Sequence, residues 1–150
     1  MGQGAEAQGR ARSTRSGGRA SHFTLATTFQ RDRHVILVVD DDHDLRESLR
    51  EILEEEGFET IGASDGREAM DLLQKGGQPA PRVILLDIMM PVMTGHEVID
   101  KLRRDRSFAS TPVVFMTAFR TLVKADEKVR VLYKPFSIEV VLSAIRNARC

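Results

Sequence analysis

The chain has 150 residues, 41% of them hydrophobic and 29% charged, which fits one globular domain with a tail. Its 22 basic and 22 acidic side chains balance, which argues against bulk attraction to nucleic acid or to an anionic membrane. Cys150 is the only cysteine and no apolar run approaches a membrane span, so we expect neither an internal disulfide nor a membrane anchor, and predict a cytoplasmic location.

Residues 1–33 differ in composition from the rest of the chain. They contain six arginines and two acidic residues, and residues 1–20 hold five glycines and no large apolar side chain. Such a stretch buries too little apolar surface to offset its chain entropy. We therefore predict a disordered or loosely ordered basic leader over residues 1–33 and a folded domain over residues 34–150. A basic arm that contacts nucleic acid or an acidic partner is the alternative to a plain linker.

Five segments have the composition of β-strands. Four of them are almost continuously apolar and rich in β-branched residues, which is typical of parallel strands covered on both faces. The second segment along the chain is weaker. In chain order the five are Val35–Val39, Glu59–Ala63, Val83–Leu86, Val113–Met116 and Val129–Tyr133.

Apolar residues between these strands recur at helical spacing. Gly57 and Gly76–Gly77 indicate helix ends, and Ser137 stands where the last helix needs an N-cap. The apolar faces of the four expected helices are formed by Leu45, Leu49, Ile52 and Leu53; Ala69, Leu72 and Leu73; Val98, Ile99 and Leu102; and Ile138, Val141, Leu142 and Ile145.

The alternation of strands and helices predicts an α/β fold with right-handed crossovers between parallel strands. We predict a doubly wound five-stranded parallel sheet of the flavodoxin-like type, with strand order 2-1-3-4-5. Ligands of such sheets bind outside the carboxyl ends of the strands. The residues that follow each strand are therefore the candidates for chemistry.

Polar side chains follow every long apolar strand. Carboxylates held together repel one another unless a cation is present, and oxygen ligands suit Mg²⁺. A lysine opposite them suits a phosphoryl group, a hydroxyl can donate to a phosphoryl oxygen, and a carboxylate can act as the nucleophile. The pattern favours metal-assisted phosphoryl transfer. The residues are Asp40, Asp41, Asp42, Asp87, Thr117 and Lys134.

Each of these residues also has an ordinary structural explanation. Asp41 and Asp42 could cap the first helix, and Asp87 could end a strand at a turn. Thr117 could be a strand residue and Lys134 a surface charge. The joint occurrence of all of them at strand ends of one sheet favours a site. The four histidines lack metal-ligand spacing, and we predict that they are surface or loop residues.

Four segments resemble the motifs of bacterial response-regulator receiver domains. They read HVILVVDDDHDLRESL, VILLDIMMPVMTGHEV, VVFMTA and LYKPF, and they follow one another in the family's order across residues 34–150. The resemblance is to single-domain, chemotaxis-regulator-like receivers. It implies a phosphorelay protein that receives phosphate from a histidine kinase or phosphotransfer protein and signals to a downstream protein through contacts. It also implies no enzyme activity beyond self-catalysed phosphoryl transfer and autodephosphorylation.

The resemblance implies that Asp87 is the phosphoacceptor. The metal, Mg²⁺ or Mn²⁺, would be held by Asp40, Asp41, Asp87 and the backbone carbonyl of Met89. Asp41 would bind the ion directly, and Asp40 largely through water. Asp42 is interpreted as a flanking acid rather than a ligand.

Three further residues receive roles from the same resemblance. Thr117 would be the switch hydroxyl that moves onto the phosphoryl group. Ala118 would be the small residue that leaves access to the acyl phosphate. Lys134 would bind the phosphoryl group, followed by Pro135 as in the family.

The sequence departs from the family in two places. Receivers commonly carry Tyr or Phe three residues before the lysine, where this chain has Val131. The segment over residues 118–130 is short for a helix with both its connections, so we expect a short, irregular or missing fourth helix. Both departures favour an alternative function, an interaction module with impaired phosphorylation-dependent switching. Met89 and Phe119, two residues after the acceptor and after Thr117, lead us to hypothesise slow hydrolysis of the phosphoaspartate.

Two other functions receive less support from the sequence. A Mg²⁺-dependent phosphohydrolase of the haloacid dehalogenase type would carry a second acid two residues after the nucleophile, where this chain has Met89. Nucleic-acid binding through the basic leader would show a steep salt dependence that deletion of residues 1–20 removes.

Overall fold

The computed structural model describes residues 35–75, 80–120, 123, 126 and 128–148. The predicted leader over residues 1–33 and the predicted helix end at Gly76–Gly77 lie outside these residues. The described part contains five strands and four helices. In chain order the elements are β1 (Val35–Val39), α2 (His43–Glu55), β2 (Glu59–Ala63), α3 (Gly66–Gln74), β3 (Val83–Asp87), α4 (Gly95–Arg104), β4 (Val113–Thr117), β5 (Val129–Tyr133) and α5 (Ile138–Asn147).

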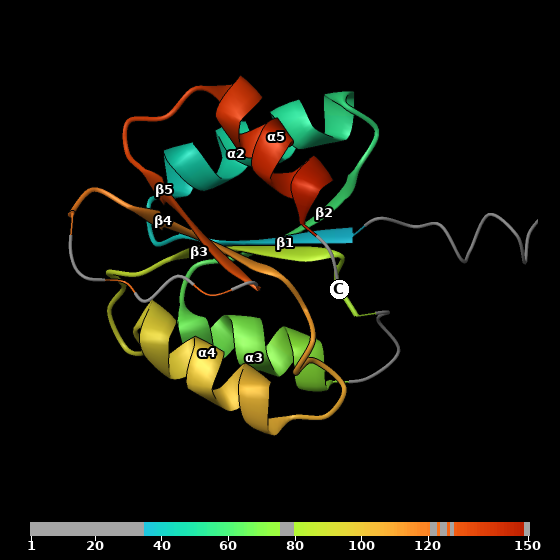
Figure 1. Cartoon of the computed structure of the whole chain (residues 1–150), viewed down its shortest axis with the longest axis vertical. Helices are drawn as coiled ribbons and strands as arrows, with labels where there is room; N and C mark the ends of the chain where they lie inside the picture. Colours follow the sequence, from blue (N-terminus) through green and yellow to red (C-terminus); the bar gives the residue numbers. More distant parts are fainter. Residues whose placement is uncertain (1–34, 76–79, 121–122, 124–125, 127, 149–150) are drawn as a thin grey trace, which may run out of the picture. The chain divides into compact units, whose positions relative to one another are not determined.

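The five strands form one parallel sheet with the order β2-β1-β3-β4-β5, which confirms the predicted fold class and strand order. Figure 1 shows α2 and α5 on one face of the sheet and α3 and α4 on the other. The register pairs Val39 with Leu86 and Thr117 with Tyr133. The residues that follow these strands therefore gather at one edge of the sheet, where the sequence predicts a site.

The sheet separates two clusters of buried side chains. Leu37 and Val39 of β1 belong to the cluster that α3 and α4 cover, and Ile36 and Val38 belong to the cluster that α2 and α5 cover. All four are at most 2% exposed. Coverage of both faces explains why the strand is apolar at every position, and each such side chain contributes about 1.5–3 kcal/mol by its burial.

Two helix ends test the signals read from the sequence. Gly57 follows α2 with φ +91°, a conformation that favours glycine. The N–H groups of Gly57 and Phe58 donate to the carbonyls of Glu54 and Leu53, which completes the predicted helix end. Ser137 occupies the N-cap position of α5 as predicted, but its side chain makes no capping hydrogen bond.

The connection between β4 and β5 is described only in part. None of its described residues is helical, and Asp126 forms an isolated antiparallel bridge with Val129. This agrees with the predicted short or irregular fourth helix; the element labelled α4 in Figure 1 is the helix that follows β3. Within the described part of the chain, no helix combines the length and apolarity that crossing a membrane requires.

Candidate functional site

Asp40 follows β1 directly, and its side chain is fully buried. Its backbone N–H donates to the carbonyl of Ala63 (3.1 Å), and its Oδ1 accepts the N–H of Asp42 (2.9 Å). Asp42 in turn caps α2, because its carboxylate accepts the N–H of Leu45 (3.1 Å). Asp42 is therefore the helix cap of this loop, and Asp41, which lies between the two, is exposed.

Asp87 is the last residue of β3 and is only 6% exposed. Its Oδ1 accepts the N–H of Met89 at 3.1 Å. Burial and, after it, the nearby charge of Asp40 raise the pKa of Asp87 to about 6, although Lys134 and the Met89 hydrogen bond oppose the shift. In the absence of a cation, the site therefore holds more negative charge than its single lysine compensates.

Lys134 follows β5 and points its ammonium group at the acids. Its Nζ lies 2.9 Å from Oδ2 of Asp40 and 3.4 Å from Oδ2 of Asp87. Burial lowers the pKa of Lys134, but the hydrogen bond and charge of Asp40, together with the charge of Asp87, raise it above its ordinary value. Its backbone N–H donates to the carbonyl of Thr117 (2.7 Å), and the Lys134–Pro135 peptide bond is cis. The lysine is thus held as a cation that faces both buried carboxylates.

Asp40, Asp41 and Asp87 form a group that could hold a metal ion. Each offers a carboxylate oxygen, and these three atoms lie within 4.8 Å of one another. Three converging carboxylates with a net excess of negative charge are a donor set of the kind that hard divalent cations bind. The residues present therefore fit Mg²⁺ or Mn²⁺, and the site gathers all three predicted carboxylate ligands.

Thr117 ends β4 and is fully buried. Its hydroxyl accepts the N–H of Phe119 (3.1 Å) and lies 3.3 Å from the carbonyl of the same residue, to which it donates. Among the described residues the hydroxyl is thus engaged with its own loop and not with Asp87. Ala118, which lies between Thr117 and Phe119 in the sequence, is exposed and presents only a methyl group at this edge of the sheet.

Two residues around the site escaped the sequence analysis. A Cβ added at Gly95 would lie 2.7 Å from the carbonyl oxygen of Asp87 and 2.9 Å from Cα of Ile88, so only glycine allows α4 to begin this close to β3. Arg46 donates from Nη1 to the carbonyl of Asp40 (2.7 Å). Gly95 belongs to the motif VILLDIMMPVMTGHEV, and Arg46 lies one helical turn into α2. Neither position in the sequence indicates which residue it contacts in the fold.

Residues 36–146 match the response regulator receiver domain, so the chain belongs to this family. The transcriptional regulatory protein CpxR of Escherichia coli (strain K12) is 46% identical over 83 residues, which are 55% of this chain and 33% of CpxR. The chain thus spans about a third of the length of this curated relative. Protein PilG of Pseudomonas aeruginosa is 33% identical over 122 residues, which cover 78% of this chain and 88% of PilG.

Solved structures show the same fold. Chemotaxis protein CheY4 of Vibrio cholerae superposes with a TM-score of 0.68 at 31% identity, covering 77% of this chain and 98% of CheY4. The response regulator TrrA of Thermotoga maritima, solved in complex with Mg²⁺-BeF, gives a TM-score of 0.63 at 30% identity and covers 75% and 96% of the two chains.

The fold, the family match and these relatives define a phosphoacceptor receiver domain of two-component signalling. Receiver domains are signalling modules rather than enzymes, they are phosphorylated by histidine kinases or phosphotransfer proteins, and they bind Mg²⁺ at an acidic pocket.

Proposed function

We propose that this chain accepts a phosphoryl group on the carboxylate of Asp87. The observation that carries the proposal is the geometry at the strand ends. A buried carboxylate with a raised pKa stands beside two further acids and 3.4 Å from the ammonium of Lys134. A carboxylate placed in this way can act as a nucleophile. The Lys134 ammonium on one side, and a cation held by the acids on the other, can stabilise the phosphoryl group that it attacks.

In the proposed reaction, an oxygen of Asp87 attacks the phosphorus atom of the donor. The new bond joins that oxygen to phosphorus, while the bond between phosphorus and the donor's imidazole nitrogen breaks and the imidazole leaves. Lys134, already directed at Asp87, neutralises charge on the phosphoryl oxygens. Thr117 donates its hydroxyl to one of these oxygens after it has left the backbone of Phe119.

The metal, Mg²⁺ or Mn²⁺, would be held by Asp40, Asp41, Asp87 and the backbone carbonyl of Met89. When bound, it supplies positive charge to the transferring phosphoryl group. The N–H of Met89 donates to Asp87 (3.1 Å) and keeps this loop against the site, which supports the proposed role of the carbonyl of the same residue.

The phosphodonor is a histidine kinase or a phosphotransfer protein, and the output passes to a downstream protein through surface contacts in the cytoplasm. The charge of the added phosphoryl group shifts the equilibrium between two conformations of the site. Self-catalysed acceptance and loss of the phosphoryl group are the only reactions in this proposal.

Incubation with acetyl phosphate and Mg²⁺, followed by intact mass measurement, tests the proposal. The wild type is expected to gain the mass of one phosphoryl group, and Asp87→Asn none. Asp42→Asn is the matched control, because Asp42 belongs to the same acidic run but caps α2, and it should label like the wild type. An equal mass increase in Asp87→Asn would refute the assignment.

Impaired switching is the second candidate function, and Val131 favours it. This side chain is partly buried against the cluster that α3 and α4 cover and lacks a ring that could change its exposure. A domain that labels on Asp87 but shows the same hydrogen-exchange pattern before and after labelling would support this candidate.

A further inference from the structure

The carbonyl group of Asp40 lies at the point where buried β1 passes into the loop of acidic residues. The Nη1 atom of Arg46 donates to this carbonyl oxygen at 2.7 Å, and the Arg46 side chain is 12% exposed. The other polar groups of Asp40 bond elsewhere: the N–H to Ala63, Oδ1 to Asp42 and Oδ2 to Lys134. Arg46 thus contributes the bond that holds the carbonyl side of this turn.

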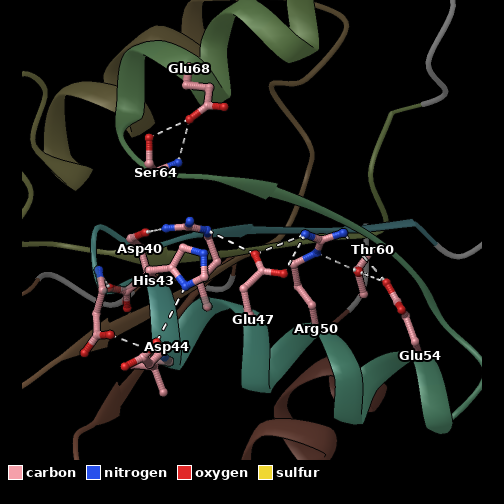
Figure 2. Close-up of polar contacts among 12 residues, drawn as sticks. Asp40, His43, Asp44, Glu47, Arg50, Glu54, Thr60, Ser64 and Glu68 are labelled. Carbon is pink, nitrogen blue, oxygen red and sulfur yellow. Dashed lines mark hydrogen bonds and ion pairs between the residues drawn. The ribbon is translucent and has the colours of Figure 1, made fainter.

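The side chains of Arg46 and Arg50 both pass over Gly62 of β2, and that of Arg50 passes closer. A Cβ at Gly62 of β2 would lie 3.5 Å from Cδ of Arg46, and 3.1 Å from Cδ of the neighbouring Arg50. The contact with Arg46 would be an ordinary one, so the bare backbone at this position matters for Arg50 and not for Arg46. Figure 2 shows Asp40, Glu47, Arg50 and Thr60 in one row of polar contacts along α2 and β2.

Glu47 links the two arginines but binds them unequally. Its Oε1 accepts Nη1 of Arg50 at 3.1 Å and lies 3.6 Å from Nε of Arg46. Arg50 also donates from Nε to the hydroxyl of Thr60 (3.1 Å). Arg46 and Arg50 therefore both lie on α2, near the carboxylate of Glu47 and the backbone of Gly62. Of the two, only Arg46 contacts the backbone of the acidic loop.

The charge of Arg46 also acts on Glu68 in the first turn of α3. Glu68 accepts the N–H and the hydroxyl of Ser64 at 2.7 and 2.6 Å. These hydrogen bonds lower the pKa of Glu68, and the charge of Arg46 lowers it further. Arg46 thus lies 3.6 Å from the carboxylate of Glu47 and near enough to Glu68 for its charge to act there, and its side chain is only 12% exposed.

We propose that Arg46 is a positioning residue for the metal. By holding the carbonyl of Asp40 it fixes the turn that presents the carboxylates of Asp40 and Asp41 to the ion. Mg²⁺ and ions of similar preference demand near-ideal positions of their oxygen ligands, and loss of an outer partner of a ligand lowers metal affinity. This inference rests on the proposed function, since it presupposes that these acids bind the ion.

Mn²⁺ titration of the full chain, followed by the electron paramagnetic resonance signal of free Mn²⁺, measures the affinity without any phosphoryl chemistry. Arg46→Met is expected to bind Mn²⁺ about tenfold more weakly than the wild type, the lower end of the effect of losing such a partner. Arg50→Met, the matched control, loses the contacts to Glu47 and Thr60 and should keep the wild-type affinity. Arg46→Lys keeps a charged donor and should recover most of the affinity.

The outcomes separate the inference from the proposed function. Wild-type affinity in Arg46→Met, or an equal loss in both methionine variants, would overturn the role of Arg46. A wild type that binds no Mn²⁺ would overturn the proposed metal site itself. Should Arg46→Met fail to fold, Arg46→Gln provides the second test: its shorter side chain loses the hydrogen bond to the Asp40 carbonyl and should weaken Mn²⁺ binding, and unchanged affinity would count against the inference.

Discussion

Met89 and Phe119 flank the site with apolar side chains that are 59% and 56% exposed. Their backbones are tied to the site, because the N–H of Met89 donates to Asp87 and the N–H of Phe119 donates to Thr117. The side chains, in contrast, carry no hydrogen-bond donor and no strong acceptor. A water molecule that approaches a phosphoryl group on Asp87 would find nothing on these two residues to orient it.

Replacement of Met89 by Asn should shorten the lifetime of the phosphorylated protein. One hydrogen bond to the attacking water, worth about 1 kcal/mol in the transition state, corresponds to about fivefold faster decay. Loss of the phosphoryl mass after removal of the phosphodonor measures the rate. Met89→Leu serves as the control and should decay like the wild type, and an unchanged rate in Met89→Asn would contradict the hypothesis of slow hydrolysis caused by these apolar residues.

The helices differ in how their first turns are held. Thr94 begins α4 with a complete capping box, in which its hydroxyl accepts the N–H of Glu97 and the Glu97 carboxylate accepts the N–H of Thr94. Ser137 has the N-cap conformation at α5 but makes no such bond. Ser and Thr are both preferred N-cap residues, and the structure shows that only the Thr94 side chain makes the capping bond.

This difference predicts unequal effects of alanine at the two caps. Thr94→Ala should lower the free energy of unfolding by about 1 kcal/mol, the usual loss for an N-cap side chain. Ser137→Ala should leave it nearly unchanged, since there is no capping bond to lose. Urea unfolding of both variants measures the difference, and equal losses would show that Ser137 caps α5 in solution.

The segment that joins β4 to β5 connects the site to an exposed aromatic ring. The hydroxyl of Thr117 bonds to the backbone of Phe119, and the guanidinium of the next residue, Arg120, lies 5.3 Å above the ring of Tyr133. Tyr133 is also the register partner of Thr117. Movement of the Thr117 hydroxyl towards Asp87 would therefore release the loop that carries Arg120.

Tyrosine fluorescence can follow this movement, because Tyr133 is the only tyrosine of a chain without tryptophan. Phosphorylation should change its emission, since loss of the stacked guanidinium alters the surroundings of the ring. Thr117→Val should label on Asp87 without this change. A labelled wild type with unchanged emission would instead favour the impaired-switching candidate.

The acid cluster affects the stability of the whole domain. Burial and the charge of Asp40 raise the pKa of Asp87 from its ordinary 3.8 to about 6 in the metal-free protein. The native state therefore binds this proton more tightly than the unfolded chain does. The ionised carboxylate thus lowers the free energy of unfolding progressively as the pH rises through this interval, and fully above about pH 6.

Asp87→Asn should remove this penalty. With a chelator present near neutral pH, we expect the variant to be more stable than the wild type by about 3 kcal/mol, a difference that vanishes towards about pH 4. Saturating Mg²⁺ should shrink or reverse the difference, because it binds the wild-type native state more tightly. Thermal unfolding at several pH values measures this, and a difference that does not depend on pH would contradict it.

Hydrophobic pattern sufficed to predict the fold, since runs such as Val35–Val39 can only be buried between two layers of helices. The same pattern placed Asp40 and Asp87 at one edge of the sheet. It could not predict the contacts of Arg46 or the tight approach at Gly95, because these depend on the packing of α2 and α4 against the loops. The orientation of the Thr117 hydroxyl is likewise a rotamer choice that no sequence spacing encodes.

The site draws its groups from the ends of β1, β3, β4 and β5, which are separated by long stretches of chain. During synthesis on the ribosome, the acids of β1 emerge well before Lys134, and the ammonium group reaches them only after β5 has joined the edge of the sheet. A nascent or partly folded chain therefore has the carboxylates of the site without the ammonium group that offsets their charge. We therefore expect competence for phosphate to appear late in folding, so that a kinase acts on finished domains and ignores immature ones.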